Sequence, residues 1–325
     1  MRAVRVVRLD GPESLEVREV PEPTAGDGQV VIDVYAAGVS FPDALLTRGR
    51  YQLRPEPPFS PGSEVAGVVR SAPADAGVRP GDRVAAFPGI GGFQDVVAID
   101  PSLVFPLPDR VSFVAGAGLP MNYLTVHFGL VRRGRLRPGE TVLVHGAAGG
   151  VGTAAIQLAK ALDAGVIAVA SSEAKRKLAR DVGADEAVDV AGFKAAVQAL
   201  TGGRGVDLVV DPVGGDRFTD SLRSLAPEGR LLVIGFTGGE IPTVKVNRLL
   251  LNNLDLVGVG WGAFALPRPG YLREQWTDLL PHVESGALDP PIGGTYPVER
   301  ATQAVGALER RDASGKLVII FQNEV

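Results

Sequence analysis

The sequence predicts an α/β protein of two domains, a β-rich N-terminal domain followed by a parallel sheet with helices on both faces. Three observations support this prediction. Short strand patterns fill residues 1–120, strand and helix patterns then alternate from Thr141 to Gly260, and a glycine-rich turn follows the first strand of the alternating part. Strands that alternate with helices form a parallel sheet that helices cover on both sides. The chain has 325 residues, 45 % of them hydrophobic, enough for two compact cores.

The N-terminal region shows strand patterns separated by glycine and proline, as is typical of an all-β unit. Strands are expected at Arg2–Leu9, Leu15–Val20, Val30–Ala37, Glu64–Ser71, Asp82–Ala86 and Phe93–Ile99. One helix is expected from Pro42 to Arg48, with proline near its start and Gly49 just past its end. We expect these strands to form a closed or folded-over barrel. The stretch from Ser112 to Arg133 is helical in pattern and should lead into the second domain.

The centre of the second domain is a strand, turn, helix and strand in succession. Thr141–Val144 is a β-branched run, the helix pattern covers Thr153–Leu162, and Val166–Ala170 is a second apolar run. Between the first strand and the helix lies Gly146-Ala-Ala-Gly-Gly-Val-Gly152. Nearly bare backbone allows a pyrophosphate to approach, and the helix start favours its negative charge. This order is typical of dinucleotide-binding proteins of the doubly wound Rossmann type.

We therefore expect the turn to bind a dinucleotide through backbone N–H groups; a tight turn that serves packing alone is the alternative. The predicted contacts are Ala148, Gly149, Gly150, Val151 and Gly152. Ala147 occupies the first glycine position of the usual G-x-G-x-x-G pattern. Its methyl group is tolerable if the backbone there keeps φ below zero.

The alternation continues to Gly260, and the predicted elements give the domain boundaries. Helices are expected at Lys175–Val182, Gly192–Leu200, Asp216–Leu225, Pro267–Gly286 and Ala301–Arg311; strands at Ala187–Val190, Val206–Asp211, Arg230–Phe236, Leu254–Gly260 and Lys316–Phe321. The last strand should return to the first domain. The predicted domains are 1–122, 123–262 as the nucleotide-binding domain, and 263–325 as a return to the first domain.

The end of the second strand predicts which dinucleotide binds. NAD-binding proteins normally carry Asp or Glu there to bond the adenosine ribose, whereas this chain has Ser171 and Ser172 followed by Lys175 and Arg176. Serine hydroxyls can bond a 2′-phosphate and the cations can add charge-assisted bonds. The sequence therefore predicts NADPH, although Glu173 could serve the ribose of NADH instead. Lys177 is expected only to form part of a solvated helix face.

Composition excludes several classes of function. The net charge of −4 gives nothing that would attract nucleic acid or an anionic membrane. There is no cysteine, so disulfides, thiolate catalysis and cysteine-ligated zinc are excluded. The N-terminus reads as a strand rather than a signal peptide, and no apolar run reaches the roughly 20 residues that span a bilayer. We expect a cytoplasmic protein with no nucleic-acid or membrane partner.

Several segments resemble the medium-chain dehydrogenase/reductase superfamily, specifically its zinc-free quinone oxidoreductase branch. They are AAGVSFPDALLTRGRY (36–51), PFSPGSEVAGVV (58–69), PGDRVAA (80–86), NYLTVHFGL (122–130), VHGAAGGVGTAAIQLAKAL (144–162) and SGKLVII (314–320). The resemblance implies a GroES-like barrel domain plus a Rossmann domain with NADPH between them. Zinc-using members carry a Gly-His-Glu triplet, which here is Gly62-Ser63-Glu64. With that donor set missing, we expect no catalytic metal and no alcohol dehydrogenation.

The resemblance implies hydride transfer from NADPH to a small, electron-poor acceptor, with a quinone first. A 2-enoyl thioester or enone reductase is the alternative, because Ser40 and Leu45 stand where many quinone oxidoreductases have Asn and Tyr. An alternative of another class is an NADPH-binding protein without catalysis. Family members pair through the strand that corresponds to Leu254–Gly260, which implies a homodimer.

Candidate site residues come from strand ends and from the resemblance. Ligands of open α/β sheets bind at the carboxyl ends of the strands, which nominates Val213, Gly235 and Phe236. The resemblance adds Asp43, Tyr51 and Asn122 for positioning substrate or nicotinamide, and Thr125 and Lys316 for the cofactor, while Gly260 and Trp261 follow the last sheet strand. Each also has an ordinary structural alternative, such as helix capping for Asp43 or a surface charge for Lys316. His127, His145 and His282 are expected to be structural.

Overall fold

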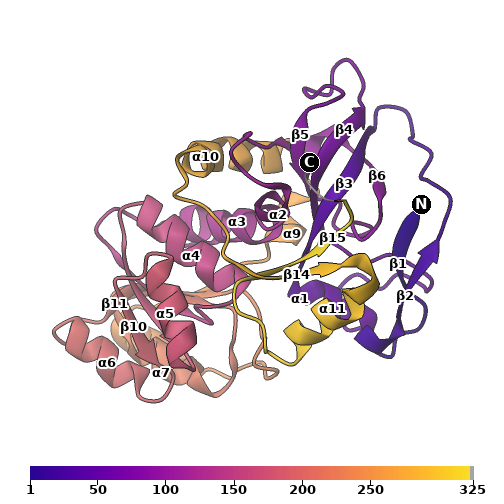
Figure 1. Ribbon diagram of the computed structural model, residues 1–325. Coiled ribbons are helices and arrows are strands. Elements are labelled where there is room, and N and C mark those ends of the chain that lie inside the picture. Colours follow the sequence, from indigo (N-terminus) through magenta and orange to yellow (C-terminus); the bar gives the residue numbers. More distant parts are fainter. Residues whose placement is uncertain (323–325) are drawn as a thin grey trace. The chain divides into compact units, whose positions relative to one another are not determined.

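A computed structural model describes residues 1–322 of the chain, which divides into two compact units (Figure 1). Unit 1 consists of Met1–Met121, Pro269–Leu280 and the chain from Pro290 onward. Unit 2 consists of Asn122–Arg268 and Pro281–Asp289. Over residues 1–322, no helix is both long and apolar enough to cross a membrane.

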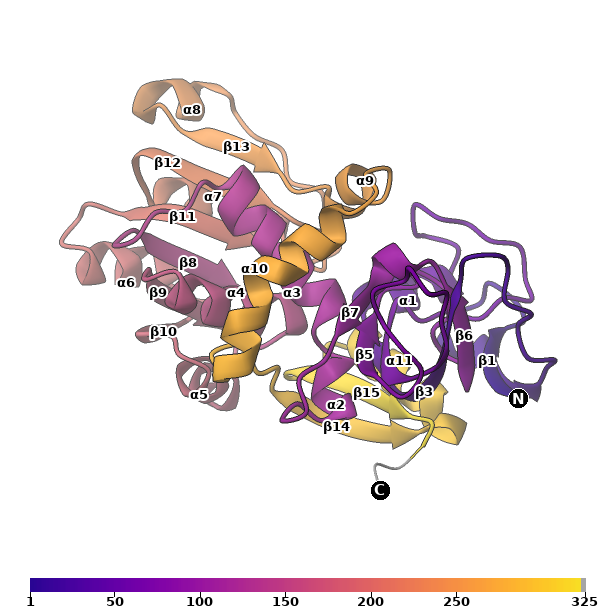
Figure 2. The same cartoon turned by 90° about the horizontal axis from the view of Figure 1, so that it is seen from above.

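Unit 2 is built on a parallel sheet of six strands in the order β10-β9-β8-β11-β12-β13. Their bounds are β8 Thr141–His145, β9 Gly165–Ala170, β10 Glu186–Asp189, β11 Val206–Asp211, β12 Leu225–Val233 and β13 Asp255–Gly258. Figure 2 shows β10 and β13 at opposite edges of this sheet. The strand order reverses between β8 and β11, which is where doubly wound sheets bind ligands. The predicted α/β class is confirmed.

Helices connect and cover these strands. They are α3 Pro120–His127, α4 Gly150–Ala161, α5 Glu173–Asp181, α6 Phe193–Leu200, α7 Phe218–Arg223, α8 Asn247–Asn252 and α9 Trp261–Ala265. Helix α4 packs on β8 and β9, and its residues from Gly152 to Ala159 are buried. The small side chains of this stretch let the helix lie close to the sheet, which fixes where its N-terminus stands.

Unit 1 contains a seven-stranded sheet in the order β14-β15-β3-β4-β5-β7, with β6 also paired to β3, and a separate β1-β2 hairpin. The strands are β1 Arg2–Val6, β2 Leu15–Glu19, β3 Val30–Val39, β4 Glu64–Ser71, β5 Arg83–Ala86, β6 Val96–Ile99, β7 Val104–Pro106, β14 Ile292–Pro297 and β15 Lys316–Ile320. Strand β3 pairs with β4 along one edge, while its other edge pairs first with β6 and then with β15. The sheet therefore bends around β3, and the apolar side chains of its strands form the core of the unit.

The helices of unit 1 are α1 Phe41–Thr47, α2 Phe113–Gly116 and α11 Ala301–Glu309, and α10 Tyr271–Ser285 runs through the limit between the units. The last strand, β15, pairs with β3 of the first part of the chain. Several details differ from the prediction. Strands β7 and β14 and helix α8 were not predicted. Strand β12 runs from Leu225 to Val233 rather than from Arg230 to Phe236, and α10 begins at Tyr271 rather than Pro267.

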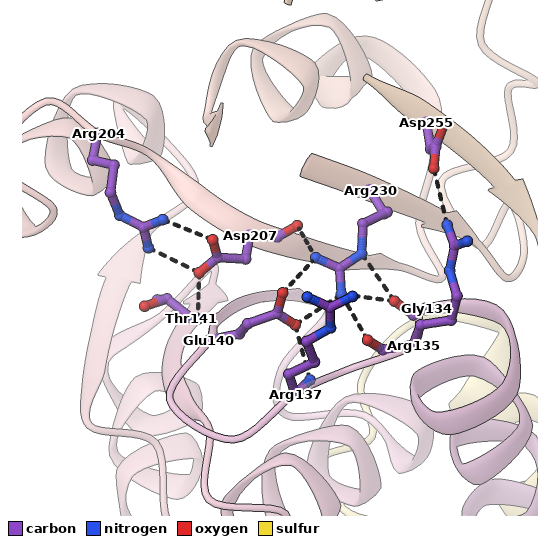
Figure 3. A network of polar contacts seen from close by, with 9 residues as sticks. All are labelled: Gly134, Arg135, Arg137, Glu140, Thr141, Arg204, Asp207, Arg230 and Asp255. Atoms are coloured by element: carbon purple, nitrogen blue, oxygen red, sulfur yellow. Dashed lines mark hydrogen bonds and ion pairs between the residues drawn. The ribbon is translucent and has the colours of Figure 1, made fainter. Parts of the chain in front are cut away.

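A buried arginine joins the start of β8 to the middle of the sheet (Figure 3). Arg230 on β12 donates to Glu140 through Nη1 at 2.9 Å and Nη2 at 2.8 Å, and its Nε donates to the Gly134 carbonyl at 2.9 Å. Its Nη1 also donates to the Asp207 carbonyl at 3.1 Å. Gly134 ends a π-helical turn, Phe128–Arg133, that continues from α3. The arginine therefore holds the connection between α3 and β8 against the sheet.

Candidate functional site

The predicted dinucleotide turn lies between β8 and α4, and its glycines are required by close backbone contacts. A Cβ atom on Gly152 would stand 2.2 Å from the Gly146 carbonyl oxygen, so only glycine fits there. Gly146 itself has a φ of 59°, in the left-handed region that favours glycine. Ala147 is not among the residues with positive φ, so the methyl group at the first position of the motif costs no backbone strain. The local chain thus builds the tight turn that the sequence predicts.

Helix α4 begins without a side-chain cap. Gly149 is its N-cap residue, and no side chain accepts a hydrogen bond there. The first N–H groups of a helix have no partner within it, and here they belong to Gly150, Val151 and Gly152. Gly149, Gly150 and Val151 are partly exposed. This helix start therefore offers N–H donors and a positive dipole end, which together favour an anion such as a phosphate.

Asn122 and Thr125 lie on α3, three residues apart and so on one helix face. A Cβ built on Gly150 would stand 2.5 Å from Asn122 Nδ2, so the Asn122 amide lies directly against the start of α4. Between them on α3, buried Tyr123 donates to Gln157 Oε1 of α4 at 2.5 Å. Gln157 in turn donates to the Asp289 carbonyl at 2.7 Å. These bonds fix α3 on α4 and hold Asn122 in its place.

Residues predicted to bind a 2′-phosphate follow β9. Ser171 is exposed, whereas the Ser172 hydroxyl caps α5 by accepting from the Lys175 N–H at 3.3 Å. Arg176 donates to Glu173 at 3.0 Å and also bonds Asp189, so two carboxylates already hold its guanidinium. Those bonds raise the pKa of Arg176, with the Glu173 bond the largest cause. Ser171 and Lys175 share the loop and first turn after β9, and their cofactor roles stay predictions.

The carboxyl ends of β8, β11 and β12 come together as expected. The Val213 side chain lies near Gly146, since a Cβ there would stand 3.1 Å from Val213 Cγ2, and Phe236 lies against Gly214. Asp211 shapes this loop, because its Oδ1 accepts from the N–H groups of Val213 at 2.8 Å and Gly214 at 2.9 Å. Burial raises the pKa of Asp211 despite these bonds.

Gly235 stands in the same loop cluster, since a Cβ on it would be 3.5 Å from the Pro212 carbonyl oxygen. Gly260 and Trp261 follow β13, where Val259 donates to the Val233 carbonyl at 3.0 Å. The Trp261 side chain is buried, and Gly260 serves as the N-cap residue of α9. Among the predicted cofactor residues of unit 2, the glycine turn, Val213, Gly235 and Phe236 therefore form one group at the strand ends.

In unit 1, Asp43 is fully buried near the start of α1. Its Oδ2 accepts from the Ser40 N–H at 2.8 Å and its Oδ1 from the Gly62 N–H at 3.0 Å. Burial raises the pKa of Asp43 to about 7, although these two bonds favour the charged form. The capping alternative for Asp43 is thus present in the structure, since Ser40 and Asp43 form a capping box. Its predicted part in catalysis stays a prediction, as does that of Tyr51, whose hydroxyl pKa burial also raises.

Lys316 is buried rather than at the surface, so the surface-charge alternative was wrong. Its ammonium pairs with Glu64 and donates to Ser40 Oγ at 2.8 Å, and Ser40 Oγ donates to Glu64 Oε1 at 3.0 Å. The second oxygen of Glu64 accepts from the Met121 N–H at 2.8 Å. The sequence analysis did not predict this group. One feature of the sequence indicates this group: Lys316 is the first residue of an otherwise apolar strand. A cation buried there needs a carboxylate partner.

The histidines show no metal-binding arrangement. His145 is buried, its Nε2 lies 2.8 Å from Ser221 Oγ, and burial lowers its pKa to about 3. Its ring also contacts the Phe193 ring edge-on. Among residues 1–322, no group of three or more histidine, cysteine, aspartate or glutamate side chains is placed to hold a metal ion.

Two family models match the chain. The model described as "Alcohol dehydrogenase GroES-like domain" matches residues 26–109, which lie in unit 1. The model described as "Zinc-binding dehydrogenase" matches residues 150–285 and begins in the glycine turn. The first model covers Ser40, Asp43 and Glu64 but not Lys316, and the second covers α4 but not β8.

Relatives of known sequence and structure span nearly the whole chain. "Quinone oxidoreductase-like protein 2" of Rattus norvegicus is 38 % identical over 98 % of this chain and 91 % of its own length. A probable oxidoreductase from Mycobacterium abscessus has a crystal structure with a TM-score of 0.90 at 48 % identity, covering 98 % of both chains. The quinone oxidoreductase from Thermus thermophilus, solved alone and in complex with NADPH, gives a TM-score of 0.85 at 37 % identity, over 99 % of this chain and 100 % of that one. The chain belongs to the quinone oxidoreductase branch of the medium-chain dehydrogenase/reductase superfamily.

Proposed function

We propose that this protein is an NADPH-dependent reductase that transfers hydride to a quinone. The observation that carries the proposal is the uncapped start of α4 behind the glycine turn, beside a strand end with Ser171 where NAD-binding proteins have an acid. The NADPH complex of the Thermus relative supports the same cofactor. NADPH, when bound, supplies the hydride and leaves as NADP⁺.

The residues of this chain bind and orient rather than exchange protons. The N–H groups of Gly150 and Val151 would hold the diphosphate, and the loops of Val213 and Phe236 would border the cofactor at the strand ends. A quinone that accepts hydride becomes a hydroquinone anion, which one proton from water neutralises. The Asp43 carboxyl and the Lys316 ammonium are both hydrogen-bonded inside unit 1. Because water supplies the proton, neither group has to act as a proton donor. Positioning of the two reactants is then the main source of rate.

The substrate class is tested by turnover with 1,4-benzoquinone and with a crotonyl thioester under the same NADPH concentration. We expect a higher kcat/KM for the quinone. A much higher value for the thioester would overturn the quinone proposal in favour of an enoyl reductase. NADPH binding without oxidation by any acceptor of a broad panel would instead indicate a binding protein.

Cofactor choice is tested by reversing the charge of Lys175. Lys175→Glu should raise KM for NADPH about tenfold or more and change KM for NADH little, since one charge-assisted bond to the phosphate is lost. Lys177→Glu is the matched control, because Lys177 is on the same helix, its side chain is 70 % exposed, and it pairs with Asp181. Equal effects of Lys175→Glu on both cofactors would refute phosphate recognition at this position.

We also propose that the protein is a homodimer through the open edge of β13. This strand has one neighbour, β12, so its other edge is unpaired within the described residues. Leu256 on β13 and Leu250 and Leu251 on α8 are exposed, and an unpaired apolar edge is prone to pair with another strand. Light scattering of the purified protein should give twice the chain mass of 33.9 kDa. A monomer at micromolar concentration would contradict the dimer.

A further inference from the structure

Asn122 presents a polar group that the fold leaves without a partner. The residue is 6 % exposed, and within residues 1–322 its amide makes no hydrogen bond. Neither amide atom is among the fully buried side-chain atoms that lack a partner, so the amide stays within reach of a ligand. The hydrogen bond from Tyr123 to Gln157 holds α3 against α4. The backbone of Asn122 therefore keeps a fixed position beside the start of α4.

The amide lies against the start of α4, whose first N–H groups are donors. Asn122 Nδ2 is the atom closest to a Cβ built on Gly150, at 2.5 Å. Gly150 opens α4, whose first N–H groups have no side-chain acceptor. The Nδ2 donors cannot bond the N–H donors of the helix start, and the amide acceptor Oδ1 stands farther away, 3.2 Å from the same Cβ position. A ligand that bonds both must bring acceptor atoms, and the helix dipole favours acceptors that carry negative charge.

We propose that Asn122 is a ligand of the cofactor diphosphate, with its Nδ2 donating to a phosphate oxygen that the start of α4 also binds. This inference rests on the proposed NADPH-dependent function. It assigns Asn122 to the diphosphate instead of the substrate or nicotinamide position predicted from the sequence. The amide supplies an uncharged donor, which adds to the backbone N–H groups at the N-terminus of α4. The helix dipole favours a phosphate at this end.

The experiment uses 2′-phospho-ADP-ribose, which carries the diphosphate and lacks the nicotinamide. Isothermal titration measures its Kd for the full-length wild type, Asn122→Asp and Asn122→Ala. Asn122→Asp keeps the shape and places a negative charge against the phosphates, so Kd should rise about tenfold or more; Asn122→Ala should raise it about three- to tenfold. Gln198→Glu, on the exposed face of α6, adds the same charge elsewhere in unit 2 and should leave Kd unchanged.

The outcomes separate the two proposals. If the wild type and both Asn122 variants bind the probe equally tightly, the diphosphate role is overturned while the NADPH proposal stands. If the wild type does not bind the probe at all, both are overturned. Should the aspartate variant fail to fold, which circular dichroism would show, the alanine variant decides on the same criterion. If Gln198→Glu raised Kd as much as Asn122→Asp, the weaker binding would come from the change in net charge alone. That result would overturn the assignment.

Discussion

Arg230 in unit 2 and Lys316 in unit 1 are both cations held by a glutamate inside a sheet, yet the two pairs have different surroundings. The side chains of Arg230 and Glu140 are 10 % and 20 % exposed, and carbonyl groups of Gly134 and Asp207 share the guanidinium (Figure 3). The side chains of Lys316 and Glu64 are 4 % and 0 % exposed. Besides each other, these two have Ser40 and one backbone N–H.

The difference shows where a lost partner can be replaced by water. Glu140 has enough exposure for solvent to reach it if the arginine is removed. Glu64 has none, so without the lysine its charge would be buried and uncompensated. Removing one member of a fully buried pair costs more than the pair itself contributes, because the remaining charge is left uncompensated. The following predictions test this contrast, from the largest expected effect to the smallest.

Lys316→Met should lower the free energy of unfolding by about 3–5 kcal/mol, because Glu64 loses its counter-ion inside the core. Urea denaturation of the variant and the wild type measures the difference. The double variant Lys316→Met with Glu64→Gln removes both charges and should recover part of the loss. A single variant within about 1 kcal/mol of the wild type would contradict a buried ionised pair.

Asp43 should make unit 1 less stable as pH rises. Its pKa of about 7 in the fold stands above the ordinary value of 3.8, so the folded state holds the proton more tightly. The resulting stabilisation is complete below pH 3.8 and is lost as pH rises through 7, by roughly 4 kcal/mol in total. Unfolding free energies of the wild type and Asp43→Asn between about pH 4 and 8 measure it. The wild type should lose stability relative to the variant over this range; a constant difference would show that the carboxyl titrates normally.

Arg230→Met should cost about 2–3 kcal/mol, less than the lysine substitution, because the exposed part of Glu140 can be hydrated. Chemical denaturation followed by circular dichroism measures the change, and it should include loss of order in the connection from Gly134 to Glu140. A loss larger than that of Lys316→Met would reverse the comparison between the two regions.

Asp255→Asn should have the smallest effect, no more than about 0.5 kcal/mol. Asp255 bonds Arg135 at 3.1 Å at the rim of the Arg230 group, with side chains 54 % and 68 % exposed. Thermal unfolding at low and high salt measures it, and the midpoint should barely move in either. A shift as large as that of Arg230→Met would mean that the rim and the centre act as one network.

The sequence predicts the parts of this fold in which local pattern and tertiary structure agree. The unit from β8 to β9 follows its predicted order because a buried strand, bare turn and apolar helix face are each visible within a few residues. Strand β14 was missed because Gly293, Gly294 and Pro297 disfavour strands. It is tolerated because it lies at the sheet edge, where proline and glycine cost less.

Site residues divide in the same way. The glycine turn was predictable, since its chemistry lies in consecutive residues. The partners of Lys316 were not, because Glu64 stands 252 positions earlier in the chain and meets it only through the pairing of β15 with β3 and β3 with β4. Likewise the contact between Asn122 and Gly150 depends on how α3 packs on α4, which no spacing in the sequence encodes.

The place of β15 between β14 and β3 has a consequence for biosynthesis. The polypeptide leaves the ribosome N-terminus first, so the first strands of unit 1 emerge long before the strand that completes their sheet. Until Lys316 has been translated, Glu64 has no ammonium to neutralise it. The strands of unit 2 are all synthesised earlier, and each pairs with neighbours that lie closer along the chain. Nascent chains should therefore gain protease resistance first in unit 2, and in unit 1 only after β15 has been synthesised.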